Sequence, residues 1–156
     1  MRRLVFGAAW MRTTMLAFVF VICGAFAADA QQPRHPAGDW STQGGWATVR
    51  IAPCANNVER LCGNILALRR PNDRNGQPLR DNENPDPALR ARTLVGLPFI
   101  WDFRSSGRRW TGGHIYDPDS GRTYGSNMRV RPDGNLEVNG CVLFICQAQV
   151  WTRASP

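Results

Sequence analysis

The stretch Trp110-Thr111-Gly112-Gly113-His114-Ile115-Tyr116-Asp117-Pro118-Asp119-Ser120-Gly121-Arg122-Thr123-Tyr124 places turn-forming residues between two runs of β-forming residues. Pro118 presets φ at the second position of a turn, and Gly121 tolerates the positive φ that many turns require. Asp and Ser side chains can also bond to the nearby backbone. The stretch therefore predicts a β-hairpin.

The strand after this turn alternates in polarity. One face carries Tyr124, Ser126, Met128 and Val130, and the other carries Thr123, Gly125, Asn127, Arg129 and Arg131. A period of two is typical of a strand with one buried face. Ligand pockets combine an apolar lining with a few polar groups. The first face, continued by Leu136 and Val138 in the next strand, is therefore a candidate ligand-binding surface.

The remaining residues predict further short strands joined mostly by tight turns. Strand-like runs cover residues 38–42, 46–52, 62–68, 94–103, 136–139 and 147–153, and residues 53–61 are expected to form a loop. Neither an internal repeat nor a long helix is visible. About eight short strands predict an all-β fold, an antiparallel barrel or sandwich, in a single domain.

Residues 69–92 are rich in Asn, Asp, Pro, Gly and Arg, and they predict a long loop. Asp86 can cap one short helix there, Pro87 suits its first position, and residues 88–92 can continue it. Oxygen ligands of the kind that Ca²⁺ accepts are supplied by Asp81, Glu83, Asn84 and Asp86, without the spacing of an EF-hand. The nearby Arg80, Arg90 and Arg92 could pair with these carboxylates instead. We favour that pairing and expect no metal and no cofactor.

The first 30 residues have the features of a secretory signal peptide. Three arginines precede an apolar run over residues 15–27, and Ala28-Asp29-Ala30 fits an A-x-A cleavage site. The run is too short to make a good spanning helix. We expect a cleaved protein of the periplasm or the extracellular space, without a transmembrane span. Residues 31–37 then form a polar leader, and residues 38–156 form the domain.

Every basic residue of the chain other than histidine is an arginine, and the formal net charge is +7. Removing Arg2, Arg3, Arg12 and Asp29 with the signal peptide lowers it to +5. Arginine forms planar forks suited to carboxylate and phosphate, so an anionic envelope ligand is one alternative and a compositional bias is the other. Export, and the lack of basic runs interleaved with aromatic residues, argue against nucleic acid.

Four cysteines follow the cleavage site: Cys54, Cys62, Cys141 and Cys146. An even number in a small exported domain favours two disulfides. Three pairings are possible, and we expect the local one, Cys54–Cys62 and Cys141–Cys146, because it closes two short loops and needs no special topology. Zinc is the competing use, but neither spacing is C-x2-C and an oxidising compartment opposes it.

The segment Gly113-His114-Ile115-Tyr116-Asp117-Pro118, followed by Gly121-Arg122-Thr123-Tyr124, resembles the bacterial exported family called domain of unknown function 2147. Other matching stretches, in order, are Gly38-Asp39-Trp40, Leu61-Cys62-Gly63, Asp81 with Asn84-Pro85, Arg92-Thr93-Leu94-Val95-Gly96-Leu97 and Trp151-Thr152-Arg153. The resemblance implies a calycin-like (lipocalin-like) β-barrel. In calycins, a Trp on the first strand and an Arg on the last close one barrel end by stacking, which implies these roles for Trp40 and Arg153.

His114 is the main candidate for chemistry, because His35 lies in the predicted leader. It could act as a general base with Tyr116, Asp117 or Asp102, and strand parity puts His114 and Tyr116 on one face. A Gly-x-Ser-x-Gly motif is absent, and one histidine in the domain argues against catalytic zinc. We therefore assign no catalytic residue. The candidate ligand-binding residues are His114, Tyr116, Tyr124 and Met128.

Residues 142–145 are four apolar residues between two cysteines and predict a hairpin tip. They could dock on a partner, insert into a membrane surface, fold over the barrel mouth, or be buried against a neighbouring loop.

We favour a non-enzymatic, monomeric barrel that binds a small apolar or amphipathic molecule or an envelope component. A structural or interaction protein with a filled barrel is the alternative. An enzyme acting on envelope material through His114 or residues 69–92 ranks last. A cavity inside the barrel would favour the first hypothesis, and a filled interior with an apolar outer patch would favour the second.

Overall fold

The computed structural model describes residues 35–155, and eight strands account for most of them. The strands are β1 (Gly38–Ser41), β2 (Ala47–Cys54), β3 (Asn57–Leu68), β4 (Pro98–Ser106), β5 (Arg109–Asp117), β6 (Arg122–Val130), β7 (Leu136–Val142) and β8 (Ile145–Arg153). Two 3-10 turns, η1 (Gln43–Gly45) and η2 (Pro87–Leu89), complete the elements. The predicted signal peptide lies outside the described residues.

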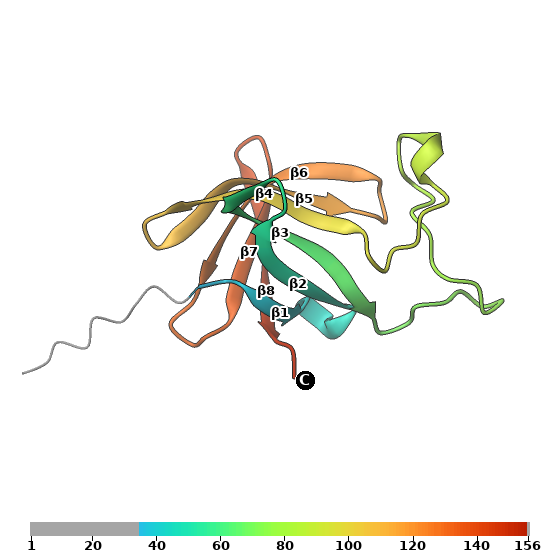
Figure 1. Ribbon diagram of the computed structural model, residues 1–156, viewed down its shortest axis with the longest axis horizontal. Helices are drawn as coiled ribbons and strands as arrows, with labels where there is room; N and C mark the ends of the chain where they lie inside the picture. The colour runs from blue at the N-terminus through green and yellow to red at the C-terminus, as the bar shows by residue number, and fades with distance from the viewer. Residues whose placement is uncertain (1–34, 156) are drawn as a thin grey trace, which may run out of the picture. The chain divides into compact units, whose positions relative to one another are not determined.

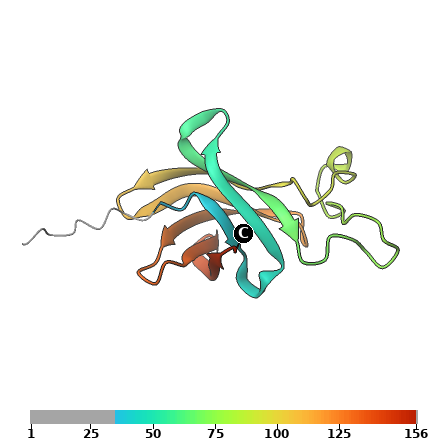
Figure 2. The ribbon, with the colours of Figure 1, turned by 60° about the horizontal axis from the view of Figure 1, so that its bottom comes forward.

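The eight strands form a closed antiparallel barrel in sequence order (Figures 1 and 2). The barrel closes between β1 and β8, where Trp40 pairs with Arg153 and Ser41 pairs with Thr152. Closure removes the exposed sheet edges that an open sandwich would leave. The predicted barrel is confirmed. None of the helices in the described part of the chain is long and apolar enough to cross a membrane.

The hairpin over residues 110–124 forms as predicted, with β5 and β6 joined at Asp117–Arg122. Its Gly113 has a packing role, because an added Cβ would lie 2.4 Å from the ring of Phe103. Only a residue without a side chain lets that ring pack against β5 at this point. Phe103 is fully buried as a result.

The loop predicted over residues 53–61 is wrong. These residues belong almost entirely to the β2–β3 hairpin, in which Ala52 pairs with Cys62 and Pro53 with Leu61. The side chains of residues 57–59 are all exposed, so this part of β3 shows no alternation of buried and exposed positions that a hydrophobic pattern could reveal. Asn57 nevertheless pairs with Cys54 across the hairpin.

Two further boundaries differ from prediction. Residues 94–97 are not a strand, since Gly96 has φ +89° and the ladder begins only at Pro98, although Leu94 and Leu97 are buried. The helix predicted over residues 87–92 is the single turn η2. Asp86 caps it through the Ala88 N–H at 2.9 Å, as expected.

One end of the barrel, where β1 begins and β8 ends, is closed by the predicted pair; we call it the closed end. The Arg153 guanidinium lies 3.9 Å from the centroid of the Trp40 ring. The Trp40 indole N–H donates to the Pro36 carbonyl at 2.7 Å, and Arg153 Nη1 donates to the Ala37 carbonyl at 2.9 Å. The buried indole and the cation above it therefore shut this end.

Side chains fill the barrel between the closed end and its middle. The fully buried members include Trp40, Val49, Ile51, Leu61, Ile65, Phe103, Met128, Leu136 and Trp151. The opposite end, where β1 ends and β8 begins, we call the open end. The long connection over residues 69–97, which links β3 to β4, also starts and finishes there (Figure 1).

Each disulfide joins the two paired strands of a single hairpin. Cys54–Cys62 links β2 to β3, and Cys141–Cys146 links directly paired residues of β7 and β8. Each bond should therefore restrict only a short loop of the unfolded chain.

We expect non-reducing peptide mapping to recover these two linkages in the folded protein. Replacing either pair by alanines should lower the free energy of unfolding by about 2–3 kcal/mol, because the loops closed are short. A peptide linking Cys54 to Cys141 would contradict this pairing, and urea titration of each double-alanine variant measures the loss.

Candidate functional site

The open end of the barrel contains a cavity of about 610 Å³. Its walls come from the β5–β6 turn, from β7 and β8 with their connecting tip, and from single residues of neighbouring elements. The lining residues are Trp46, Phe99, Ile115, Tyr116, Asp117, Pro118, Asp119, Tyr124, Val138, Gly140, Val142, Leu143, Phe144, Ile145, Gln147 and Gln149. The barrel is thus filled at one end and hollow at the other.

Aromatic rings separate the filled part from the cavity. Phe99 packs edge-on against Trp46 at 5.6 Å between centroids and stacks on Trp151 at 6.0 Å. Trp151 is fully buried, and its indole N–H donates to the side-chain carbonyl of Gln149 at 2.9 Å. The floor of the cavity is therefore apolar, and a polar amide lies beside it.

The strand face predicted for ligand binding does turn inward, but only part of it borders the cavity. Tyr124, together with Val138 on β7, lines the wall. Met128 is fully buried and lies farther along β6, paired with Val138, in the filled part of the core. Packed core side chains on the side of the closed end occupy the space beside Met128, so this residue does not reach the cavity.

His114 is not brought to the cavity either. Its neighbours Gly113 and Ile115 face the barrel core, so alternation turns the imidazole to the outer surface, where it stacks on Trp101 at 5.5 Å. Its Nδ1 atom is buried without a hydrogen-bond partner among the described residues. Asp102, considered as a partner, forms a 2.9 Å ion pair with Arg60 instead.

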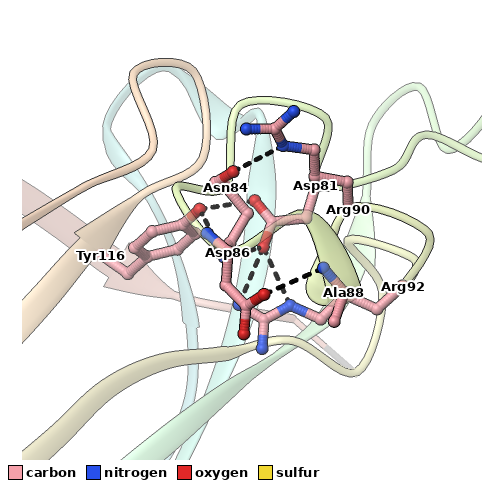
Figure 3. Close-up of polar contacts among 7 residues, drawn as sticks. All are labelled: Asp81, Asn84, Asp86, Ala88, Arg90, Arg92 and Tyr116. Carbon is pink, nitrogen blue, oxygen red and sulfur yellow. Dashed lines mark hydrogen bonds and ion pairs between the residues drawn. The ribbon is translucent and has the colours of Figure 1, made fainter.

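Tyr116 borders the cavity and also anchors the long connection. Its hydroxyl donates to Asp81 at 2.6 Å and accepts from the Asn84 amide at 3.1 Å (Figure 3). Arg92 donates to the second Asp81 oxygen at 2.8 Å, as does the Asn84 amide at 2.7 Å. Asp81 is fully buried, and this polar cluster holds residues 81–92 against β5.

Of the three arginines expected to pair with carboxylates of this loop, Arg92 does so, whereas Arg90 and Arg80 bond to backbone carbonyls instead. Arg92 forms the ion pair with Asp81, and Arg90 donates to the Asn84 carbonyl at 2.7 Å. Arg80 donates to the Ala91 carbonyl. Among residues 35–155, no group of three or more His, Cys, Asp or Glu side chains is arranged to hold a metal ion.

Burial, and then the hydrogen bond to Asp81, raise the pKa of the Tyr116 hydroxyl above its ordinary value. The hydroxyl is therefore a hydrogen-bond donor at neutral pH rather than a base. Sequence reasoning named both Tyr116 and Asp81 but did not join them, because 35 residues separate them in the chain.

The apolar tip over residues 142–145 projects from the cavity rim. Val142, Leu143, Phe144 and Ile145 are 57%, 88%, 99% and 81% exposed. Burial of the tip against a neighbouring loop is therefore wrong for this structure. Leu143 has φ +54°, and the Cys141–Cys146 disulfide braces the turn that presents these side chains.

Known proteins resemble this chain in sequence pattern and in fold. A sequence model of the family described as an uncharacterized protein conserved in bacteria (DUF2147) matches residues 38–153. Protein HP1028 from Helicobacter pylori, described as belonging to the lipocalin family, has a similar solved structure with a TM-score of 0.64 and 22% sequence identity. The match covers 78% of this chain and 84% of that chain, and it shows the fold alone. No curated protein gave a significant match.

Proposed function

The chain belongs to the bacterial family DUF2147, and on this premise we propose that it is a non-enzymatic barrel that binds a small apolar or amphipathic molecule in its open end. The observation that carries the proposal is the cavity of about 610 Å³. Ligand sites commonly have volumes of about 300–1,000 Å³ and a mostly apolar lining with a few polar groups. An eight-stranded barrel can hold one small ligand or be filled by side chains, and this barrel has room left at one end.

The proposed location is the periplasm or the extracellular space. Two disulfides in a small domain are typical of an oxidising compartment. The signal-peptide pattern of the first 30 residues agrees with export. In that setting the ligand is an envelope component or a molecule that crosses the envelope, and the protein acts as a monomer.

Gly140 offers a way to fill the cavity without disturbing the core. It lines the cavity, and an added Cβ would meet Ile115 and Tyr124 at ordinary contact distances of 3.5 and 3.9 Å. Gly140→Leu should therefore place its side chain in the ligand space, and replacing glycine in a strand costs no backbone strain here. We expect saturable binding of an apolar fluorescent probe by the mature protein and at least a tenfold weaker Kd in this variant, of the order expected for losing ~1.4 kcal/mol.

Gly125→Leu is the matched control, since Gly125 is paired across from Cys141 on the neighbouring strand and an added Cβ there meets nothing within 4 Å. It should bind the probe like the unmodified protein. Equal affinities for all three proteins, with unchanged thermal unfolding, would place binding outside the cavity and contradict the proposal.

A second candidate function, docking on an envelope partner, is favoured by the exposure of the apolar tip. Docking can be distinguished from ligand binding because different substitutions should abolish the two functions. Replacing Leu143 and Phe144 by serine should release the protein from envelope fractions if docking is its function, and Gly140→Leu should leave that association unchanged.

A further inference from the structure

We propose that the cavity selects a ligand with a positively charged head group and disfavours the anionic head group of a fatty acid. The inference rests on the proposed function and adds the ligand class. It runs against the net charge, +7 for the whole chain and +5 after the predicted cleavage, which taken alone would favour an anionic ligand.

The charged residues that line the cavity are both acidic. Asp117, the last residue of β5, and Asp119, in the β5–β6 turn, are the charged side chains of the lining, and no arginine of the described residues belongs to it. Trp46, Phe99 and Tyr124 supply the aromatic faces. The cavity thus has negatively charged side chains at its rim and aromatic side chains in its interior.

The turn holds the charge of Asp117 in place without neutralising it. One Asp117 oxygen accepts from the Asp119 backbone N–H at 3.1 Å, and the other accepts from the Ser120 hydroxyl at 2.6 Å. Neither donor carries a charge. Neither Asp117 nor Asp119 takes part in the ion pairs found among residues 35–155.

An apolar chain inside the barrel would leave its head group beside these carboxylates. A cation there gains attraction from both acids and contacts aromatic faces that favour positive charge. An anion at the same point meets two like charges. Among ligands with the same apolar chain, a cationic head group should therefore raise the affinity and an anionic head group should lower it.

Arginines that could reverse this preference lie outside the cavity. Arg69 and Arg70 line a separate hollow of about 280 Å³ that shares Trp46, Pro118 and Asp119 with the cavity rim. Arg69 also donates to the Gly44 carbonyl at 3.2 Å. Arg122 pairs in register with Asp117 on β6 but is absent from the lining. Arg69 and Arg70 line only this second hollow, so a head group held in the cavity itself lies beside the acidic residues of the cavity lining.

The test compares three ligands with the same twelve-carbon chain below their micelle concentrations: dodecyltrimethylammonium, dodecyl maltoside and dodecyl sulfate. Displacement of a neutral apolar probe from the mature protein gives each Kd at low salt. We expect the cationic ligand to bind about tenfold tighter than the anionic one, with the neutral one between them, and the ratio to shrink at high salt. Asp119→Asn should lower this ratio, and adding Asp117→Asn should bring it close to one.

Glu59→Gln is the control, because it removes the same charge at the exposed β2–β3 hairpin of the closed end. It should leave the ratio unchanged. The inference would be overturned if the anionic ligand bound as tightly as the cationic one, or if Asp119→Asn left the ratio of their Kd values unchanged. In either case, binding of the maltoside would still uphold the proposed function. Failure of the probe and all three ligands to bind would overturn both.

Discussion

Trp40→Ala should lower the free energy of unfolding by about 3–5 kcal/mol, the range for removing a large buried aromatic side chain. The indole is fully buried at the closed end, and its N–H donates to Pro36. The substitution empties a site where β1, β8 and the residues before β1 meet, so little can collapse into the space. Urea titration followed by far-UV circular dichroism measures the loss.

Arg153→Ala should cost less, because the guanidinium is exposed on one side and its hydrogen bonds go to backbone carbonyls near the surface. The double variant should lose less than the sum of the two single losses, since the ring and the cation lie 3.9 Å apart. Additive losses would mean that the stacking contributes nothing to stability.

Asp81→Ala should lower the free energy of unfolding by about 2–4 kcal/mol. A fully buried carboxylate then no longer accepts from Tyr116, Asn84 and Arg92, and the buried hydroxyl and amide lose their partner. We do not expect the larger loss of stability that follows when a fully buried ion pair is broken, because the Arg92 side chain is 34% exposed and can turn to water.

A second readout distinguishes loss of this cluster from general destabilisation. Because the hydrogen bond to Asp81 helps to raise the pKa of Tyr116, the folded Asp81→Ala variant should form tyrosinate at lower pH than the unmodified protein. Asp73→Ala, in the same long connection but outside the cluster, is the control. An unchanged tyrosinate titration in Asp81→Ala would show that the Asp81 bond does not set this pKa.

Local patterns in the sequence predicted most of the barrel. The Asp117–Gly121 turn, the alternation after it and the short spacing of the cysteines are all features of neighbouring residues, and the structure contains the corresponding hairpins. The Trp40–Arg153 stack spans the chain, and it was expected only through the family resemblance.

Features that depend on distant contacts escaped prediction. The Asp81–Tyr116 bond joins a loop to a strand, and nothing in either local sequence encodes the partner. The cavity depends on where core side chains stop filling the barrel. Alternation assigned Tyr124 and Met128 to one face, yet Tyr124 borders the cavity and Met128 lies in the packed core. Periodicity gives the face of a residue but not its depth along the barrel axis.

Native mass spectrometry of the mature protein, purified from the bacterial envelope without detergent, tests the central claim most directly. The account predicts a folded protein that carries a small molecule with one-to-one stoichiometry. The added mass should disappear in Gly140→Leu, which fills the cavity, and remain in Gly125→Leu, which alters the outer surface. The same added mass in both variants, or none in any of the three proteins together with no saturable binding of apolar probes, would contradict a ligand-binding cavity.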